Sequence, residues 1–272
     1  MAKRPWLSAL LVVAMLIPIA FPLYWALVAS LTSEAALFRE PSLWPSEPIV
    51  EHYRALFATR DFWTPIRNSL VVAGTTTLFC VAVGSLAAYA LARLEFRGKA
   101  LILGFILAVS MFPQISIVSP LYLLLRAMRL INTYPGLIMP YMTFAMPLTV
   151  WLLVGYFRQL PKDLEEAALV DGASRLSAFW RIILPLAMPG LATTAILTFI
   201  YCWNEFLFAL SFTLGPERQT VPVAIALFRG EYQVPWGEIL AASVIATAPV
   251  ALIVLSFQRR IVQGLTSGAV KG

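Results

Sequence analysis

Hydrophobic residues gather along this chain in six long stretches that polar segments separate. The stretches are residues 7–31, 68–92, 100–125, 138–157, 187–213 and 238–257. A helix needs roughly 20 apolar residues to cross a bilayer core about 30 Å thick, where every backbone group must be satisfied within the protein. The pattern therefore predicts an all-α membrane protein with six transmembrane helices.

Basic residues Lys3 and Arg4 precede the first stretch, as they would in a signal peptide. The apolar core of a signal peptide is about 7–15 residues long, and the stretch at 7–31 exceeds that length. We therefore expect an uncleaved membrane anchor.

Prolines interrupt several of the six stretches. They are Pro18, Pro22, Pro113, Pro120, Pro140, Pro147 and Pro249. A proline leaves a carbonyl without its helical partner, so such a helix packs against a neighbour or lines a wet cavity. Both interpretations remain open for each proline.

The composition agrees with a membrane location, because 60% of the residues are hydrophobic and only 12% are charged. Soluble domains average about 45–50% apolar and 25% charged residues. These values argue against a cytosolic protein, a nucleic-acid binder and a disordered chain.

The 20 Lys and Arg residues, in a chain of net charge +6, indicate the orientation. One side of the membrane would carry twelve: Lys3, Arg4, Arg93, Arg97, Lys99, Arg158, Lys162, Arg175, Arg181, Arg259, Arg260 and Lys271. The other would carry eight: Arg39, Arg54, Arg60, Arg67, Arg126, Arg129, Arg218 and Arg229. Cytoplasmic loops hold the excess of basic residues, so both termini are predicted to be cytoplasmic.

The loop at 158–185 predicts a helix, a glycine turn and a second helix. Pro161 and Asp163 fit the start and the cap of the first helix, and Gly172 fits the left-handed residue after it. Ser174 fits the cap of the second helix, which Pro185 would stop or kink. Leu164, Leu169, Phe179 and Trp180 add an apolar face. From these residues alone, the face could sit in a partner's groove or rest on lipid headgroups.

The same loop carries a motif of seven fixed positions. They are Glu166, Ala167, Ala168, Gly172, Ile182, Leu184 and Pro185. This motif resembles the EAA signature of ABC importer permeases and matches it at every position. The chain is also similar to the carbohydrate branch of that family, of the maltose/trehalose type, over essentially its whole length. Further matching stretches lie at 88–93, 203–206 and 264–272.

The resemblance implies a type I ABC importer permease architecture in a bacterial or archaeal cytoplasmic membrane. Residues 1–66 would form the first transmembrane helix and an external loop. Residues 67–258 would form the permease core with five transmembrane helices and the EAA loop. Residues 259–272 would form a cytoplasmic tail.

An ATP-driven importer of a di- or oligosaccharide is the function that the resemblance implies. Its partners would be a second related permease, two ATPase subunits and an extracytoplasmic sugar-binding protein. The seven motif residues would dock in a cleft of the ATPase, and Thr266, Ser267 and Gly268 would contact the ATPases. The chain would be no enzyme and would bind no cofactor or metal, because the ATPase would use ATP and Mg²⁺.

The motifs that are absent from the sequence agree with ATP hydrolysis by a separate subunit. No G-x-x-x-x-G-K-[ST] occurs, and neither H-E-x-x-H nor G-x-S-x-G is present. The alternative function from another class is an ion-coupled secondary carrier, or a membrane enzyme, that uses Glu205 as a proton-active group.

Glu205 lies inside the fifth apolar stretch, where a charge must face a partner or a wet cavity. With Asn204 it could line the translocation pathway and offer hydrogen bonds to sugar hydroxyls. It could equally be a structural carboxylate paired with Arg218, Arg129 or a second permease.

Three further polar positions have simpler interpretations. Gln114 is a weaker pathway candidate in the third stretch. Asn68 and Ser69 are expected to cap the second helix, and His52 is expected to be a solvated loop residue.

Overall fold

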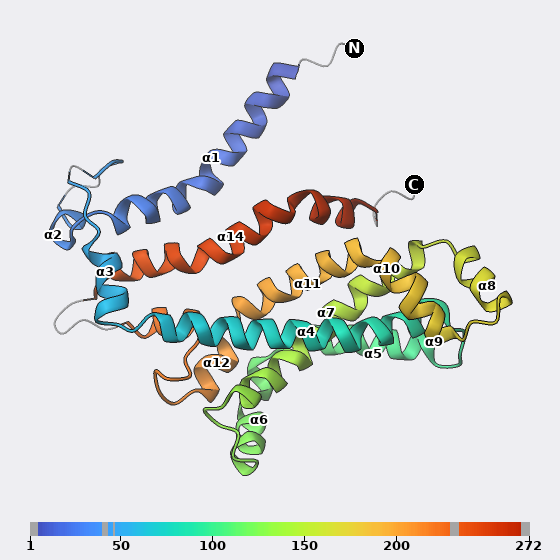
Figure 1. The fold of residues 1–272 in the computed structure, drawn as a ribbon. Coiled ribbons are helices and arrows are strands. Elements are labelled where there is room, and N and C mark those ends of the chain that lie inside the picture. Colours follow the sequence, from blue (N-terminus) through green and yellow to red (C-terminus); the bar gives the residue numbers. More distant parts are fainter. Residues whose placement is uncertain (1–4, 40–42, 46, 229–233, 268–272) are drawn as a thin grey trace. The chain divides into compact units, whose positions relative to one another are not determined.

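The computed structural model describes residues 5–39, 43–45, 47–228 and 234–267, and every regular element in these ranges is a helix (Figure 1). The first part of the chain contains α1 (Pro5–Ser30), α2 (Glu34–Leu37), α3 (Glu51–Ala58), α4 (Trp63–Arg93), α5 (Lys99–Met111), α6 (Ile115–Ala127) and α7 (Tyr134–Gln159). The second part contains α8 (Asp163–Val170), α9 (Arg175–Ala178), the π-helix η1 (Phe179–Ile183), α10 (Leu184–Leu186), α11 (Met188–Trp203), α12 (Leu207–Phe212), α13 (Val221–Ala226) and α14 (Trp236–Ser267). The all-helical fold class is confirmed.

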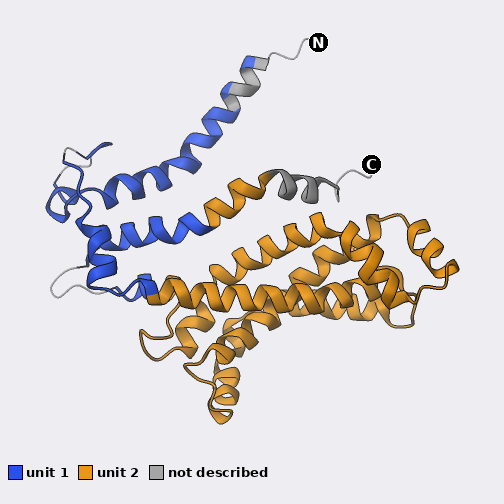
Figure 2. Cartoon of the chain, in the orientation of Figure 1, with its two compact units in different colours: residues 1–63, 224–249 blue, residues 64–223, 250–272 orange. Residues whose placement is uncertain are grey.

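The chain divides into two compact units (Figure 2). Unit 1 combines residues 1–63 with residues 224–249, and unit 2 combines residues 64–223 with residues 250–272. The candidate functional residues of the EAA loop and of the third and fifth apolar stretches all lie in unit 2.

Polar contacts join the segments of unit 1. Arg60 and Glu238 form an ion pair of 2.8 Å, and the Gly237 amide donates to Glu34 at 2.8 Å. The expectation for His52 is wrong: it is buried in α3, with its Nε2 3.0 Å from the Thr32 carbonyl oxygen. The mixed polar and apolar pattern at 51–58 did not reveal that this face turns inward.

The four long helices that could each cross a membrane alone agree with four of the predicted stretches. They are Val12–Ser30, Trp63–Arg93, Tyr134–Gln159 and Trp236–Gln258. The other two stretches correspond to helix pairs that bend sharply, so the number of candidate spans reaches six if each pair counts as one.

The third predicted stretch is not one continuous helix. α5 and α6 meet at 95°, and the break between them contains Pro113. Proline lacks the amide that a helix interior needs, and it disfavours helical backbone in the residue before it, here Phe112 with ψ 131°.

The fifth predicted stretch, 187–213, is also interrupted. α11 ends at Trp203, and α12 begins at Leu207 after a short non-helical segment. A second bend, of 76°, separates the helical run Arg175–Leu186 from α11. The predicted domain boundaries at 66 and 258 stay predictions, although α14 continues as a helix to Ser267.

Aromatic and aliphatic side chains form the core of unit 2 where α4, α7, η1 and α11 meet. Its members include Ala88, Tyr89, Leu153, Val154, Phe157, Phe179, Ile183 and Leu191. The rings of Phe157 and Phe179 are fully buried and lie edge to face at 6.3 Å. This core joins the EAA loop to two long helices.

Candidate functional site

The EAA loop folds as a helix, a glycine turn and a second helical run, as predicted. Gly172 has φ +85°, a backbone conformation that side chains rarely adopt, and open space surrounds the position of a Cβ. Ser174 caps α9 by accepting a hydrogen bond from the Ser177 amide at 3.2 Å. The predicted cap of α8 is wrong, because Asp163 is already the first residue of that helix.

The motif residues divide between the surface and the interior. Glu166, Ala167 and Pro185 are exposed, Ala168 is buried, and Ile182 and Leu184 are half-buried. Ala168 therefore allows α8 to pack closely against the rest of unit 2, while Glu166 and Ala167 face outward. The second helical run passes through η1, and a π-helical turn of this kind is frequent at functional sites.

The exposed apolar residues of the loop differ from the predicted set. Leu164, Leu176 and Trp180 are exposed. Phe179 is fully buried instead, with its ring 5.0 Å from that of Tyr89. The remaining exposed apolar groups are available to a partner or to lipid.

Glu165 is the residue that sequence reasoning overlooked. Its side chain is 9% exposed, and it accepts a hydrogen bond from the Tyr89 hydroxyl at 2.5 Å. Arg93, itself 3% exposed, lies 3.6 Å away from Nε to Oε2. No local pattern in the sequence marked Glu165, because adjacent residues of a surface helix can both be exposed, as Glu166 and Ala167 are.

A cavity of about 350 Å³ opens beside α8. Its lining residues are Arg93, Glu95, Lys162, Glu165, Glu166, Leu169 and Arg175. Three of these residues are basic and three are acidic, so the lining has no single sign of charge.

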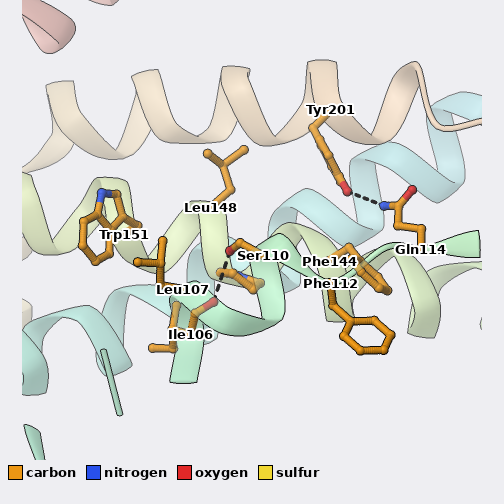
Figure 3. A pocket seen from close by; sticks show the side chains of 10 residues that line it. Ile106, Leu107, Ser110, Phe112, Gln114, Phe144, Leu148, Trp151 and Tyr201 are labelled. Atoms are coloured by element: carbon orange, nitrogen blue, oxygen red, sulfur yellow. Dashed lines mark hydrogen bonds between the residues drawn. The ribbon is translucent and has the colours of Figure 1, made fainter. Parts of the chain in front are cut away.

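Gln114 lies at the break between α5 and α6 and lines a second cavity, of about 400 Å³ (Figure 3). Figure 3 shows its amide directed at the hydroxyl of Tyr201, which receives a hydrogen bond of 2.7 Å. Phe112, Phe144 and Trp151 supply aromatic walls. Aromatic walls with a few placed polar groups are typical of small-molecule sites.

Glu205 holds the chain at the interruption after α11. Its carboxylate accepts hydrogen bonds from the amides of Phe208 at 2.8 Å and Ala209 at 3.2 Å, at the start of α12. Arg218, one of the alternative partners, does not pair with it among the described residues: its guanidinium carbon lies 4.4 Å from the centroid of the Tyr134 ring. Asn204 is exposed and donates to the Ile200 carbonyl at 2.8 Å.

The predicted helix caps at Asn68 and Ser69 are wrong, because α4 begins at Trp63. Asn68 donates to the carbonyls of Glu217 and Gln219, and Ser69 accepts from the Val221 amide at 2.8 Å. These side chains hold the segment before α13. A hydrogen bond from the side chain of Asn132 lowers the pKa of Glu217 in the same segment.

The predicted site residues also include three in the C-terminal tail, as contacts to the ATPases. Thr266 and Ser267 end α14, and Gly268 lies outside the described residues. Within the described ranges, no group of three His, Cys, Asp or Glu residues could hold a metal ion.

Residues 80–267 match the model of the binding-protein-dependent transport system inner membrane component. The chain belongs to this family. It is a multi-pass permease of the inner, or cytoplasmic, membrane, and it works in an ABC transporter with a binding protein and a separate ATPase subunit that hydrolyses ATP. The alternative of an ion-coupled carrier that uses Glu205 is therefore wrong.

Three relatives of this permease are similar over most of their length. It is 46% identical to the trehalose/maltose transport system permease protein MalG of Thermococcus litoralis, covering 93% of the chain and 91% of the relative. It is 47% identical to the trehalose transport system permease protein SugB of Mycobacterium tuberculosis, covering 92% of each. It is 42% identical to the sulfoquinovosyl glycerol transport system permease protein SmoH of Agrobacterium fabrum, covering 93% of the chain and 89% of the relative.

A solved structure supports the fold of the permease. The crystal structure of a bacterial ABC transporter involved in the import of the acidic polysaccharide alginate contains a chain with TM-score 0.81 at 22% identity. The match covers 95% of this permease and 98% of that chain. The ABC importer permease architecture predicted from the EAA motif is confirmed.

Proposed function

We propose that this permease forms half of the translocation pathway of an importer for an uncharged di- or oligosaccharide of the trehalose/maltose class. The observation that carries the proposal is the identity of 46–47%, over more than nine-tenths of the chain, with permeases of trehalose and trehalose/maltose transport systems. The other half would come from a second related permease. Two ATPase subunits with ATP and Mg²⁺ and an extracytoplasmic sugar-binding protein would complete the transporter.

The EAA loop is proposed as the coupling surface. Exposed Glu166 on α8 and exposed Leu176 and Trp180 beyond the turn offer one charge and an apolar surface to a groove in the ATPase. A short helix with such a face suits docking of this kind. Gly172 would set the angle between α8 and α9, and the tail from Thr266 would reach the same partner.

The cavity at Gln114 is proposed as part of the sugar pathway. Sugars present hydroxyls at their edges and apolar C–H faces, so an amide beside aromatic rings suits them. Gln114 and Tyr201 would exchange their mutual hydrogen bond for sugar hydroxyls as the substrate passes. The Glu205 carboxylate is hydrogen-bonded to the α12 amides, and we propose that it stabilises the structure around the pathway and does not bind sugar.

The experiment is uptake in cells that lack the chromosomal gene and carry plasmid copies of it. Radiolabelled trehalose and maltose serve as substrates, and radiolabelled alanine is the unrelated control. Wild type should restore uptake of at least one sugar and leave alanine uptake unchanged. Restoration of neither sugar would contradict the proposed substrate class.

The coupling role is tested in the same cells with Gly172→Val. A β-branched residue in the left-handed conformation costs roughly 1–2 kcal/mol and would displace the turn. Gly98→Val is the matched control, because Gly98 also has a positive φ of +89° with open space around it but lies outside the EAA loop. We expect Gly172→Val to abolish uptake at normal expression and Gly98→Val to retain it. Equal uptake by the two variants would refute the coupling role.

A further inference from the structure

Two residues near the end of α4 hold α8 through a buried carboxylate. The Tyr89 hydroxyl donates to Glu165 Oε1 at 2.5 Å, and Arg93 Nε lies 3.6 Å from Glu165 Oε2. The Arg93 and Glu165 side chains are only 3% and 9% exposed. A buried charge that loses its partner is strongly disfavoured, so the pair resists separation.

The same two residues of α4 also contact the segments that flank α8. Arg93 donates from Nη2 to the Leu160 carbonyl at 2.7 Å, directly after the last residue of α7. The Tyr89 hydroxyl lies 3.4 Å from the Arg175 carbonyl at the first residue of α9. α4 therefore contacts α8 itself and the chain immediately before and after it.

The ring of Tyr89 adds a packed contact to these polar ones. It lies 5.0 Å from the ring of Phe179 in η1 and 6.4 Å from the ring of Phe157 in α7, measured between centroids. Phe157 and Phe179 are fully buried. A close-packed core transmits displacement because it has little free volume to absorb it.

We propose that Tyr89, Arg93 and Glu165 form a strut that transmits displacement of α8 into the membrane-spanning helix α4. The three are positioning residues that act through the EAA loop. The strut makes α8, η1 and the end of α4 move as one body when the ATPase moves. The inference rests on the proposed coupling role of that loop.

A purely structural role for the same contacts predicts a different experimental result. If the contacts only stabilise the fold, their loss lowers the amount of assembled transporter and changes uptake and ATP hydrolysis in proportion. If they transmit displacement, the assembled transporter still hydrolyses ATP, but less sugar moves for each ATP. The ratio of sugar transported to ATP hydrolysed separates the two roles.

The test uses the complete transporter purified and reconstituted with its binding protein in proteoliposomes. Radiolabelled trehalose is the probe, or maltose if the wild-type transporter does not move trehalose. Tyr89→Phe removes one hydroxyl and keeps the ring in place. Tyr156→Phe is the matched control, because the buried Tyr156 hydroxyl has no hydrogen-bond partner among the described residues.

We expect Tyr89→Phe to lower the sugar-to-ATP ratio severalfold, because α4 loses its hydrogen bond to the Glu165 carboxylate. Glu165→Gln, which also removes the charge that faces Arg93, should lower the ratio at least as much. Tyr156→Phe should retain the wild-type ratio. An unchanged ratio in both strut variants, or a proportional fall of uptake and hydrolysis, would overturn the proposal.

Gly172→Val in the same vesicles distinguishes a failure of the strut from a failure of the coupling role of the EAA loop. If it lowers the ratio while the strut variants do not, the EAA loop couples and the strut is refuted. If it leaves the ratio unchanged, the coupling role itself fails.

Discussion

At the scale of single residues, the sequence indicated one buried carboxylate, that of Glu205, but not the groups that it binds. An acid within an apolar stretch marked Glu205, yet its binding of backbone amides depends on a helix break that hydrophobicity does not reveal. Glu165 was missed because its neighbour Glu166 fitted the motif. Gly172 and Ser174 were predicted correctly, since positive φ and helix capping are local preferences of the residues themselves.

The role of Glu205 leads to a prediction about stability. Glu205→Ala leaves the amides of Phe208 and Ala209 buried without acceptors, so the free energy of unfolding should fall by about 2–4 kcal/mol. Glu205→Gln keeps one carbonyl oxygen as an acceptor and should lose less. Thermal unfolding of the purified transporter measures both, with Asn204→Ala as the exposed neighbouring control.

The same variants address sugar binding. Because the carboxylate is committed to α12, Glu205→Gln should leave the half-saturating sugar concentration unchanged once assembly is equal. A large rise in that concentration with normal stability would place Glu205 in the pathway instead.

At the scale of elements, apolar length predicted the stretches that cross the membrane but not their bends. Pro113 marked the break between α5 and α6, but the 95° angle depends on how both helices pack against neighbours. The 76° bend before α11 follows η1 and Pro185, a region that the sequence placed only as the end of a helix. Because the Gln114 cavity forms at the first of these breaks, its lining residues could not be assembled from sequence.

Gly190 shows how closely α7 and α11 approach. A Cβ at Gly190 would lie 2.4 Å from Cδ1 of Tyr156, and the rigid ring has no flexible end that could move away. Gly190→Ala should therefore destabilise the permease by about 1–3 kcal/mol through overpacking.

Gly155→Ala provides the control within the same helix pair. Gly155 lies in α7 with open space around the Cβ position, so alanine should be neutral or stabilise the helix by up to about 1 kcal/mol. The unfolding midpoints of the two variants in detergent measure the difference. Equal midpoints would show that a Cβ at Gly190 does not lower the stability of the permease.

At the scale of the whole molecule, the EAA motif predicted more than hydrophobicity alone. Hydrophobic stretches predicted a membrane protein with six spans, and the seven motif positions predicted the family to which the chain belongs. The sugar could not be predicted, because no residue pattern in the chain specifies the arrangement of hydroxyls that a pathway accepts. Energy supply could be inferred, since the chain lacks a P-loop and belongs to a family served by a separate ATPase.

This energy supply gives a prediction for transport in intact cells. Sugar uptake through the wild-type transporter should continue when a protonophore collapses the proton gradient while cellular ATP is held constant. Depletion of ATP with the gradient maintained should stop it. Glu205→Gln should respond as wild type does, because the ATPase supplies the energy and the carboxylate is held by backbone amides. Uptake that follows the gradient and not the ATP level would contradict the assignment of energy supply to the ATPase. It would favour a proton-active role for Glu205.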